Sequence, residues 1–231
     1  GGKRGHGVCH LSIVRQLQIC IMNRQAAMLQ YDKSDSNILA LDTKYHGFFK
    51  LDEYRLNHKL FSGGQSKTFT REVFERGDAV VVMLYDVKHD QLLLLEQFRA
   101  GAIRANNTPW MLEFVAGMFD ENETPVDVAI RETKEEANII ITAESLSPMM
   151  KYLSSPGGMS ECIHLYLAKF DSSQVATGSV FGLDEENEDI LLHLISRPAA
   201  LALLAQGKIS NAATIIGLQW LALNYQRLSN E

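Results

Sequence analysis

The chain has 231 residues, 46% of them hydrophobic, and a formal net charge of −6. These values are typical of a globular protein with one large domain, or with one domain and a smaller one. The negative charge disfavours sequence-independent binding to nucleic acid, which needs clustered Lys and Arg against the phosphates. It permits a small anionic substrate held by a few arginines or by a metal ion.

Residues 1–41 are expected to form an N-terminal tail. The chain begins Gly-Gly, its first 21 residues differ in character from the rest of the chain, and Met22 could be a natural start. Part of this tail is therefore interpreted as added or upstream sequence and kept out of the fold. The apolar run at 11–22 is broken by Arg15, is too short to cross a bilayer, and lacks a small-residue cleavage site after it. We expect neither a signal peptide nor a membrane partner.

The cysteines indicate a reducing compartment. Cys9, Cys20 and Cys162 form an odd, sparse set without CxxC spacing. This set predicts neither a disulfide framework nor a zinc site. A cytoplasmic location is the simpler expectation.

Residues 42–75 are expected to form a small antiparallel β domain. Larger side chains alternate with polar ones over 54–60, as in a half-buried strand. The SGG at 62–64 predicts a turn, and 68–74 is rich in β-forming residues. A sheet of two or three strands is marginal alone, so we expect it to pack on the main body or on a second subunit.

Residues 76–231 mix strands and helices. The pattern predicts a buried hairpin around a polar turn at 87–90, a later strand that ends in glycine, two further strands and two C-terminal helices. The strands are expected at 78–86, 91–98, 111–117, 161–170 and 190–196, and the two helices at 198–207 and 211–228. Hairpins beside helices favour an α+β fold with a mixed sheet between helices.

A short helix is expected at 125–137. Thr124 is a suitable N-cap, Pro125 suits the first helical position, and Asp127 completes a variant of the capping box. Asn138 suits the left-handed residue that ends a helix.

This helix carries Glu132, Glu135 and Glu136 on one face. A solvated face is the simpler interpretation, because like pairs in water cost only about 0.2–0.5 kcal/mol each. In a cleft, two carboxylates about 6 Å apart would repel by about 3 kcal/mol at an effective dielectric constant near 20. A divalent cation would reverse that sign, and Mg²⁺ prefers such oxygen ligands.

The spacing of the residues around these three glutamates decides between a solvated face and a metal site. The helix and the loop before it resemble the Nudix box at seven of its nine fixed positions, and the departures are Thr133 and Asn138. Both departures are compatible with a loop–helix–loop, and every carboxylate is kept. The matching residues are Gly117, Glu123, Arg131, Glu132, Glu135, Glu136 and Ile139.

Further segments resemble the ADP-ribose pyrophosphatases of that family over most of residues 45–225, among them 71–77, 96–102, 109–118, 154–161, 182–190 and 210–221. The resemblance implies an α/β/α sandwich whose small N-terminal sheet is exchanged in a homodimer with shared active sites. It implies Mg²⁺-dependent hydrolysis of ADP-ribose to AMP and ribose 5-phosphate.

The resemblance also implies roles for individual residues. Two or three Mg²⁺ ions, with Mn²⁺ as an alternative, would be held by the Ala116 carbonyl and by Glu132, Glu136 and Glu188, with Glu135 in support. Glu186 would be the catalytic base. Without the resemblance, the acidic stretch 184–189 would be interpreted as a solvated turn, and the assignment of base and ligand within it stays open.

Substrate contacts are implied for Arg71 and Glu72, which would reach the partner subunit's substrate, and for Arg99 at the diphosphate. Without the resemblance, either arginine could be a surface ion-pair residue. Phe48 would stack on adenine or else belong to the core, Glu161 would hold the terminal ribose, and Met118 would contact substrate. Gly117, Glu123 and Arg131 would fix the loop–helix–loop.

Two other functions stay open. The substrate could be another nucleoside diphosphate derivative, such as a sugar nucleotide or a dinucleoside polyphosphate. The chain could also be a non-catalytic module that senses ADP-ribose, although its box acids are intact and we expect no basic helix-turn-helix domain attached to it.

Overall fold

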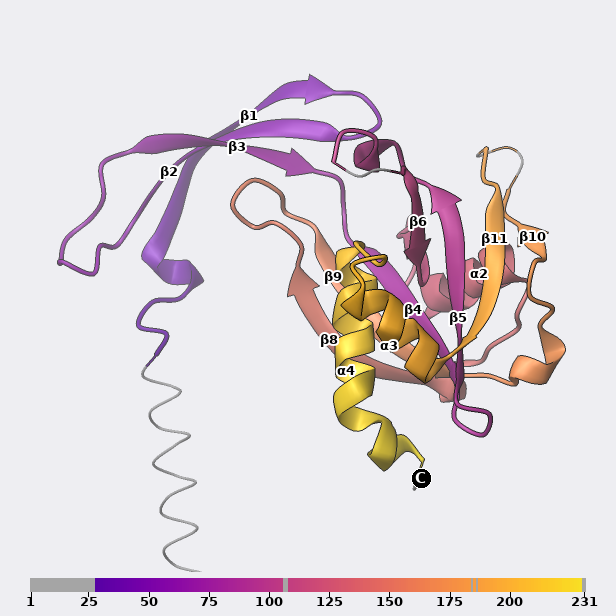
Figure 1. Cartoon of the computed structure of the whole chain (residues 1–231). Coiled ribbons are helices and arrows are strands. Elements are labelled where there is room, and N and C mark those ends of the chain that lie inside the picture. The colour runs from indigo at the N-terminus through magenta and orange to yellow at the C-terminus, as the bar shows by residue number, and fades with distance from the viewer. Residues whose placement is uncertain (1–27, 106–107, 184, 186, 230–231) are drawn as a thin grey trace, which may run out of the picture. The chain divides into compact units, whose positions relative to one another are not determined.

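The structure is a computed structural model that describes residues 28–105, 108–183, 185 and 187–229 (Figure 1). The described chain forms two compact units, which divide between Val73 and Phe74. None of its helices is both long enough and apolar enough to span a bilayer.

The first unit is a three-stranded sheet in the order β1-β2-β3. A short 3-10 turn, Lys33–Asp35, precedes β1 (Ser36–His46), which pairs antiparallel with β2 (Lys50–His58), and β3 (Phe69–Glu75) continues into the second unit. The small N-terminal sheet is therefore confirmed, and its first strand begins before residue 42, the start expected from the sequence. Gly63 and Gly64 adopt positive φ at the predicted turn. Every residue of β1 is exposed.

The second unit is built on a mixed sheet. β4 and β9 run parallel, whereas the other pairs with a known register run antiparallel. The order is β10-β11-β5-β4-β9-β8, with β6 on β5 and β7 on β4. The strands are β4 (Ala79–Asp86), β5 (Gln91–Phe98), β6 (Trp110–Glu113), β7 (Val115–Met118), β8 (Leu146–Leu153), β9 (Cys162–Lys169), β10 (Val180–Phe181) and β11 (Ile190–Ser196).

Helices cover both faces of this sheet (Figure 1). Side chains alternate along β4, so that Val81 and Met83 pack with α3 (Arg197–Ala205) and α4 (Ala212–Leu228), while Val80 and Val82 pack with α2 (Pro125–Ala137). This alternation gives each helix layer its own buried core. The α+β fold with a mixed sheet between helices is therefore confirmed.

The predicted strand at 111–117 is divided into two. β4 and β5 pair directly only beside their hairpin turn, at Tyr85↔Leu92 and Asp86↔Gln91. Beyond that point β6 pairs with β5 and β7 pairs with β4. The segment therefore crosses from β5 to β4, and its second half, β7, lies beside α2.

Candidate active site

The capping residues fix where α2 begins and ends. Thr124 Oγ1 accepts a hydrogen bond from the Asp127 amide at 3.3 Å, and Asp127 Oδ2 accepts one from the Thr124 amide at 2.9 Å. Asn138 adopts the left-handed conformation at the other end, with φ 52°. These caps fix the helix register and hence the direction in which its three glutamates project.

Glu136 is a buried carboxylate. It is 1% exposed, and its Oε2 accepts a hydrogen bond from the Ala116 amide of β7 at 3.0 Å. Burial raises the pKa of Glu136 well above its usual value, and the charges of Glu132 and Glu188 add to this effect. A buried carboxylate among like charges is costly unless a cation lies nearby.

Glu132 lies against the backbone of Gly117. A Cβ atom at residue 117 would be 1.7 Å from Glu132 Oε1, so only glycine leaves room for this side chain. Burial raises the pKa of Glu132 to about 7, although Arg131 acts in the opposite direction. This glycine of β7, just ahead of the loop that leads into α2, is thus needed for the position of a carboxylate.

Arg131 connects the loop to the helix. Its Nε and Nη2 donate to Glu123 Oε1 and Oε2 at 2.8 and 2.9 Å, and Nη2 also donates to the Met118 carbonyl at 3.1 Å. Its Nη1 donates to Glu132 at 2.7 Å and to Glu135 at 3.1 Å. The hydrogen bonds from Arg131 lower the pKa of Glu123 to about 2. A single guanidinium therefore anchors the loop and partly neutralises two of the three helix glutamates.

Glu188 lies close enough to the glutamates of α2 for its charge to act on them. It is half-buried, its Oε2 accepts a hydrogen bond from the Leu183 amide at 3.3 Å, and its charge raises the pKa of both Glu132 and Glu136. Glu186, the predicted base, lies outside the described residues.

Arg99 follows β5 and lies close to these acids. Its Nε donates a hydrogen bond to Glu113 Oε2 at 3.0 Å, and its Nη2 forms an ion pair with the same oxygen at 2.9 Å. Burial disfavours its charged form, yet Glu113 and then Glu136 and Glu188 raise the pKa of Arg99 above its usual value. Glu113, which was not predicted as a site residue, is a buried carboxylate that also accepts hydrogen bonds from Gln97 at 3.3 Å and Asn211 at 2.9 Å. Its charge within an otherwise apolar strand was the available signal.

Glu161, the predicted ribose contact, is also in the second unit. It is buried, its carboxylate accepts a hydrogen bond from Ser154 Oγ, and it forms an ion pair with Arg76 Nη1 at 2.9 Å. It lies immediately before β9.

Three predicted substrate residues belong to the first unit. Arg71 and Glu72 are exposed on β3, and the guanidinium carbon of Arg71 lies 4.6 Å from the Phe69 ring centroid. Phe48 is 88% exposed and meets Phe49 edge-on, so it is not a core residue of this chain. The predicted reach of these side chains to a partner's substrate stays a prediction.

The donor atoms around α2 suit Mg²⁺. Glu132, Glu136 and Glu188 offer carboxylate oxygens, which this ion prefers together with waters and substrate phosphates. Among the residues described, no three carboxylates of α2 and the 182–189 loop converge within 4.8 Å. Mg²⁺ usually keeps several waters, so its protein ligands need not converge that closely. The raised pKa values of Glu132 and Glu136 favour this interpretation, because a cation would offset the cost of both buried charges.

Comparison with known proteins finds one matching family model and several relatives of similar sequence. A family model described as NUDIX domain matches residues 75–210. An ADP-ribose pyrophosphatase of Escherichia coli K12 is 45% identical over 201 residues, which cover 87% of this chain and 94% of that protein. One from Haemophilus influenzae is 44% identical over 86% of this chain and 91% of its own. A GDP-mannose pyrophosphatase of Yersinia enterocolitica is 31% identical over 75% of this chain and 87% of its own.

Proposed function

The chain belongs to the Nudix family, and on that premise we propose that it hydrolyses the diphosphate of ADP-ribose to AMP and ribose 5-phosphate with Mg²⁺. The observation that carries the proposal is the pair of carboxylates on one turn of α2 that are packed against Ala116 and Gly117, with raised pKa values and Arg99 nearby. The first two relatives named above are ADP-ribose pyrophosphatases, and their alignments cover 87% and 86% of this chain.

In this proposal, Glu132, Glu136, Glu188 and the Ala116 carbonyl hold two or three Mg²⁺ ions, or Mn²⁺ in their place, with Glu135 in support. When bound, these ions neutralise the diphosphate and lower the pKa of water. Arg99 is proposed to donate to the diphosphate without leaving Glu113, because Glu113 engages its Nε and Nη2 and no described residue accepts a hydrogen bond from its Nη1. Arg131 and Glu123 hold the loop, which keeps Gly117 and Met118 in place beside substrate.

Glu186 is proposed to orient the attacking water and accept its proton. Glu186→Gln is expected to lose turnover while Mg²⁺ affinity, measured by calorimetry, is kept. Loss of Mg²⁺ binding in this variant would reverse the roles proposed for Glu186 and Glu188.

Glu161 is proposed to bind the terminal ribose through a carboxylate that Ser154 and Arg76 already orient. The homologous GDP-mannose pyrophosphatase supports a second candidate substrate class, the sugar nucleotides. A panel of ADP-ribose, GDP-mannose and a dinucleoside polyphosphate, with kcat/KM measured for each, separates the two. The proposal predicts the highest value for ADP-ribose. Binding of ADP-ribose with no turnover of any member would instead identify a sensing module.

The first unit is proposed to be exchanged between two subunits of a homodimer. Every residue of β1 is exposed, including Ile38, Leu41 and Tyr45, and an isolated three-stranded sheet is marginal. In the dimer, Arg71, Glu72 and Phe48 would reach the partner's substrate. The composition of the chain also supports a cytoplasmic location as part of this proposal.

Complementation tests the shared site. Arg71→Ala and Glu136→Gln are each expected to be inactive. When the two variants are mixed in equal amounts and dimers re-form, half of the dimers contain one subunit of each variant. Each such mixed dimer has one site in which both Arg71 and Glu136 are intact. The mixture should regain about a quarter of the parent activity. No recovery in a mixture shown to contain mixed dimers, or full activity in a monomer, would contradict the shared site.

A further inference from the structure

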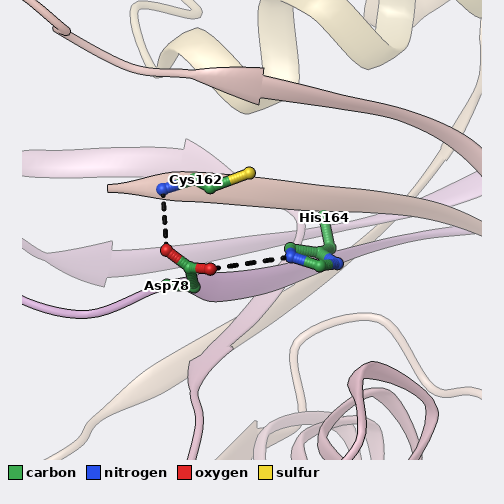
Figure 2. Close-up of side chains that lie close together, drawn as sticks. All are labelled: Asp78, Cys162 and His164. Carbon is green, nitrogen blue, oxygen red and sulfur yellow. Dashed lines mark hydrogen bonds and ion pairs between the residues drawn. The ribbon is translucent and has the colours of Figure 1, made fainter. Parts of the chain in front are cut away.

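Three potential metal-binding side chains meet at one end of the parallel strand pair β4–β9. Asp78 directly precedes β4, and Cys162 and His164 occupy alternate positions of β9, so both side chains project from one face. The register Ala79↔Ile163 brings the two strand ends together. One ligand atom from each residue lies within 4.8 Å of the others, and Figure 2 shows the carboxylate beside both partners.

The contact between Asp78 and His164 is too long for a hydrogen bond. Asp78 Oδ1 accepts a hydrogen bond from the Cys162 amide at 3.0 Å, but Oδ2 lies 3.8 Å from His164 Nε2. N–H···O hydrogen bonds are about 2.7–3.2 Å long. Two ligand atoms on one tetrahedral zinc ion, with Zn–N and Zn–O bonds of about 2.0–2.2 Å, lie about 3.4 Å apart. The observed separation is therefore closer to that of two ligands of one ion.

The His164 ring is buried and held in one orientation. The residue is 8% exposed, and its Nδ1 has no hydrogen-bond partner among the residues that the structure describes. The Phe119 ring meets the imidazole edge-on at 5.5 Å between centroids and helps to fix its orientation. Nε2, and not Nδ1, is the nitrogen 3.8 Å from Asp78, so Nε2 is the atom that would bind an ion at this cluster.

We propose that Asp78, Cys162 and His164 form a binding site for a thiophilic divalent cation, with Zn²⁺ as the best match. Thiolate, imidazole and carboxylate are all zinc ligands, whereas Mg²⁺ prefers oxygen ligands alone. None of the three residues is among those proposed to hold the catalytic ions. Cysteine spacing did not reveal the site, because the fold supplies its ligands from distant positions in the sequence.

The ion would cross-link two strand ends. Arg76 and Glu161, which form an ion pair at 2.9 Å, lie just before Asp78 and Cys162 in the sequence. Since a ligand that binds only the folded state stabilises it, Zn²⁺ is expected to raise the melting temperature of the second unit. This readout is independent of any turnover of ADP-ribose.

Cobalt gives the most direct test, because a cysteine thiolate bound to Co²⁺ has a charge-transfer band. The full chain with Cys9→Ser and Cys20→Ser keeps Cys162 as its single thiol. After chelator treatment, Co²⁺ alone should produce this band with one ion per chain, and Zn²⁺ should abolish it. Cys162→Ser should remove the band, and Asp78→Asn should weaken Co²⁺ binding at least about tenfold.

Glu132→Gln in the same background is the matched control and should keep the band. Circular dichroism establishes that each variant is folded, and Cys162→Ser and Asp78→Asn are both conservative changes. A parent protein without the band, or a band unchanged by Cys162→Ser, would overturn the proposal. A parent protein that shows the Co²⁺–thiolate band but does not hydrolyse ADP-ribose would count against the proposed function alone.

Discussion

Replacing Gly117 by alanine tests whether the position of Glu132 matters for catalysis. The added methyl would lie 1.7, 1.9 and 2.2 Å from Oε1, Cδ and Cγ of Glu132. Non-bonded atoms of this kind need about 3.5 Å, so the carboxylate must move by about 1.5 Å or more. The backbone has little freedom to move instead, because Gly117 is paired with Val80 of β4.

The displaced carboxylate also loses its 2.7 Å hydrogen bond from Arg131. A charge-assisted bond of this kind contributes about 1.5–3 kcal/mol, and a misplacement of about 1 Å near reacting atoms costs about 10²-fold in rate. We expect kcat for ADP-ribose to fall by about 10²-fold or more, and the Mg²⁺ concentration for half-maximal activity to rise. Steady-state kinetics across a Mg²⁺ titration measures both.

Gly217→Ala is the matched control. A Cβ atom there would lie 2.6 Å from Cε2 of the buried Phe114 ring, away from the α2 carboxylates. Overpacking of this kind costs about 1–3 kcal/mol of unfolding free energy, so this variant should melt earlier while its kcat stays close to that of the parent. A Gly117→Ala protein with the parent's kcat and Mg²⁺ response would refute the role assigned to Glu132.

Three other changes are expected to have measurable effects. Glu136→Gln should lower kcat by at least about 10²-fold without lowering the unfolding free energy at neutral pH, because it removes a buried charge; steady-state rates and urea denaturation check both. In metal-free protein, Glu132 has a pKa of about 7 against a usual 4.5, so the folded state binds more protons between these values. The unfolding free energy should therefore fall as pH rises from about 4.5 to about 7, by at most about 1.4 kcal/mol per pH unit. Urea denaturation over this pH range should show a smaller slope for Glu132→Gln than for the parent protein. Equal slopes would disprove the raised pKa of Glu132. Arg99→Lys should raise the KM for ADP-ribose about tenfold with a smaller change in kcat, since an ammonium cannot keep both bonds to Glu113 and reach substrate.

Local signals predicted the helix that carries the site. The helix α2 begins at Pro125 and ends at Ala137, as expected from its capping residues Thr124 and Asn138. The hairpin of β4 and β5 was also predicted, because its two apolar runs flank a polar turn. In these segments, propensity, capping and periodicity all favour the same structure.

Features that depend on tertiary contacts were missed. β8 was not predicted, and its Pro148 is atypical of a strand. It lies at the edge of the sheet, and its register shifts between Pro148 and Met150. Edge positions and bulges are where a strand tolerates proline. The division of 111–117 and the cluster at Asp78 both arise from strand pairing, which no local pattern records.

Binding of Mn²⁺ tests the central claim most directly. Electron paramagnetic resonance can count the ions bound by wild-type protein, with and without a non-hydrolysable ADP-ribose analogue, and by Glu136→Gln. We predict that wild-type protein binds Mn²⁺, that the analogue increases the number of ions bound, and that the variant loses this increase. Equal Mn²⁺ binding by both proteins under both conditions would contradict the account.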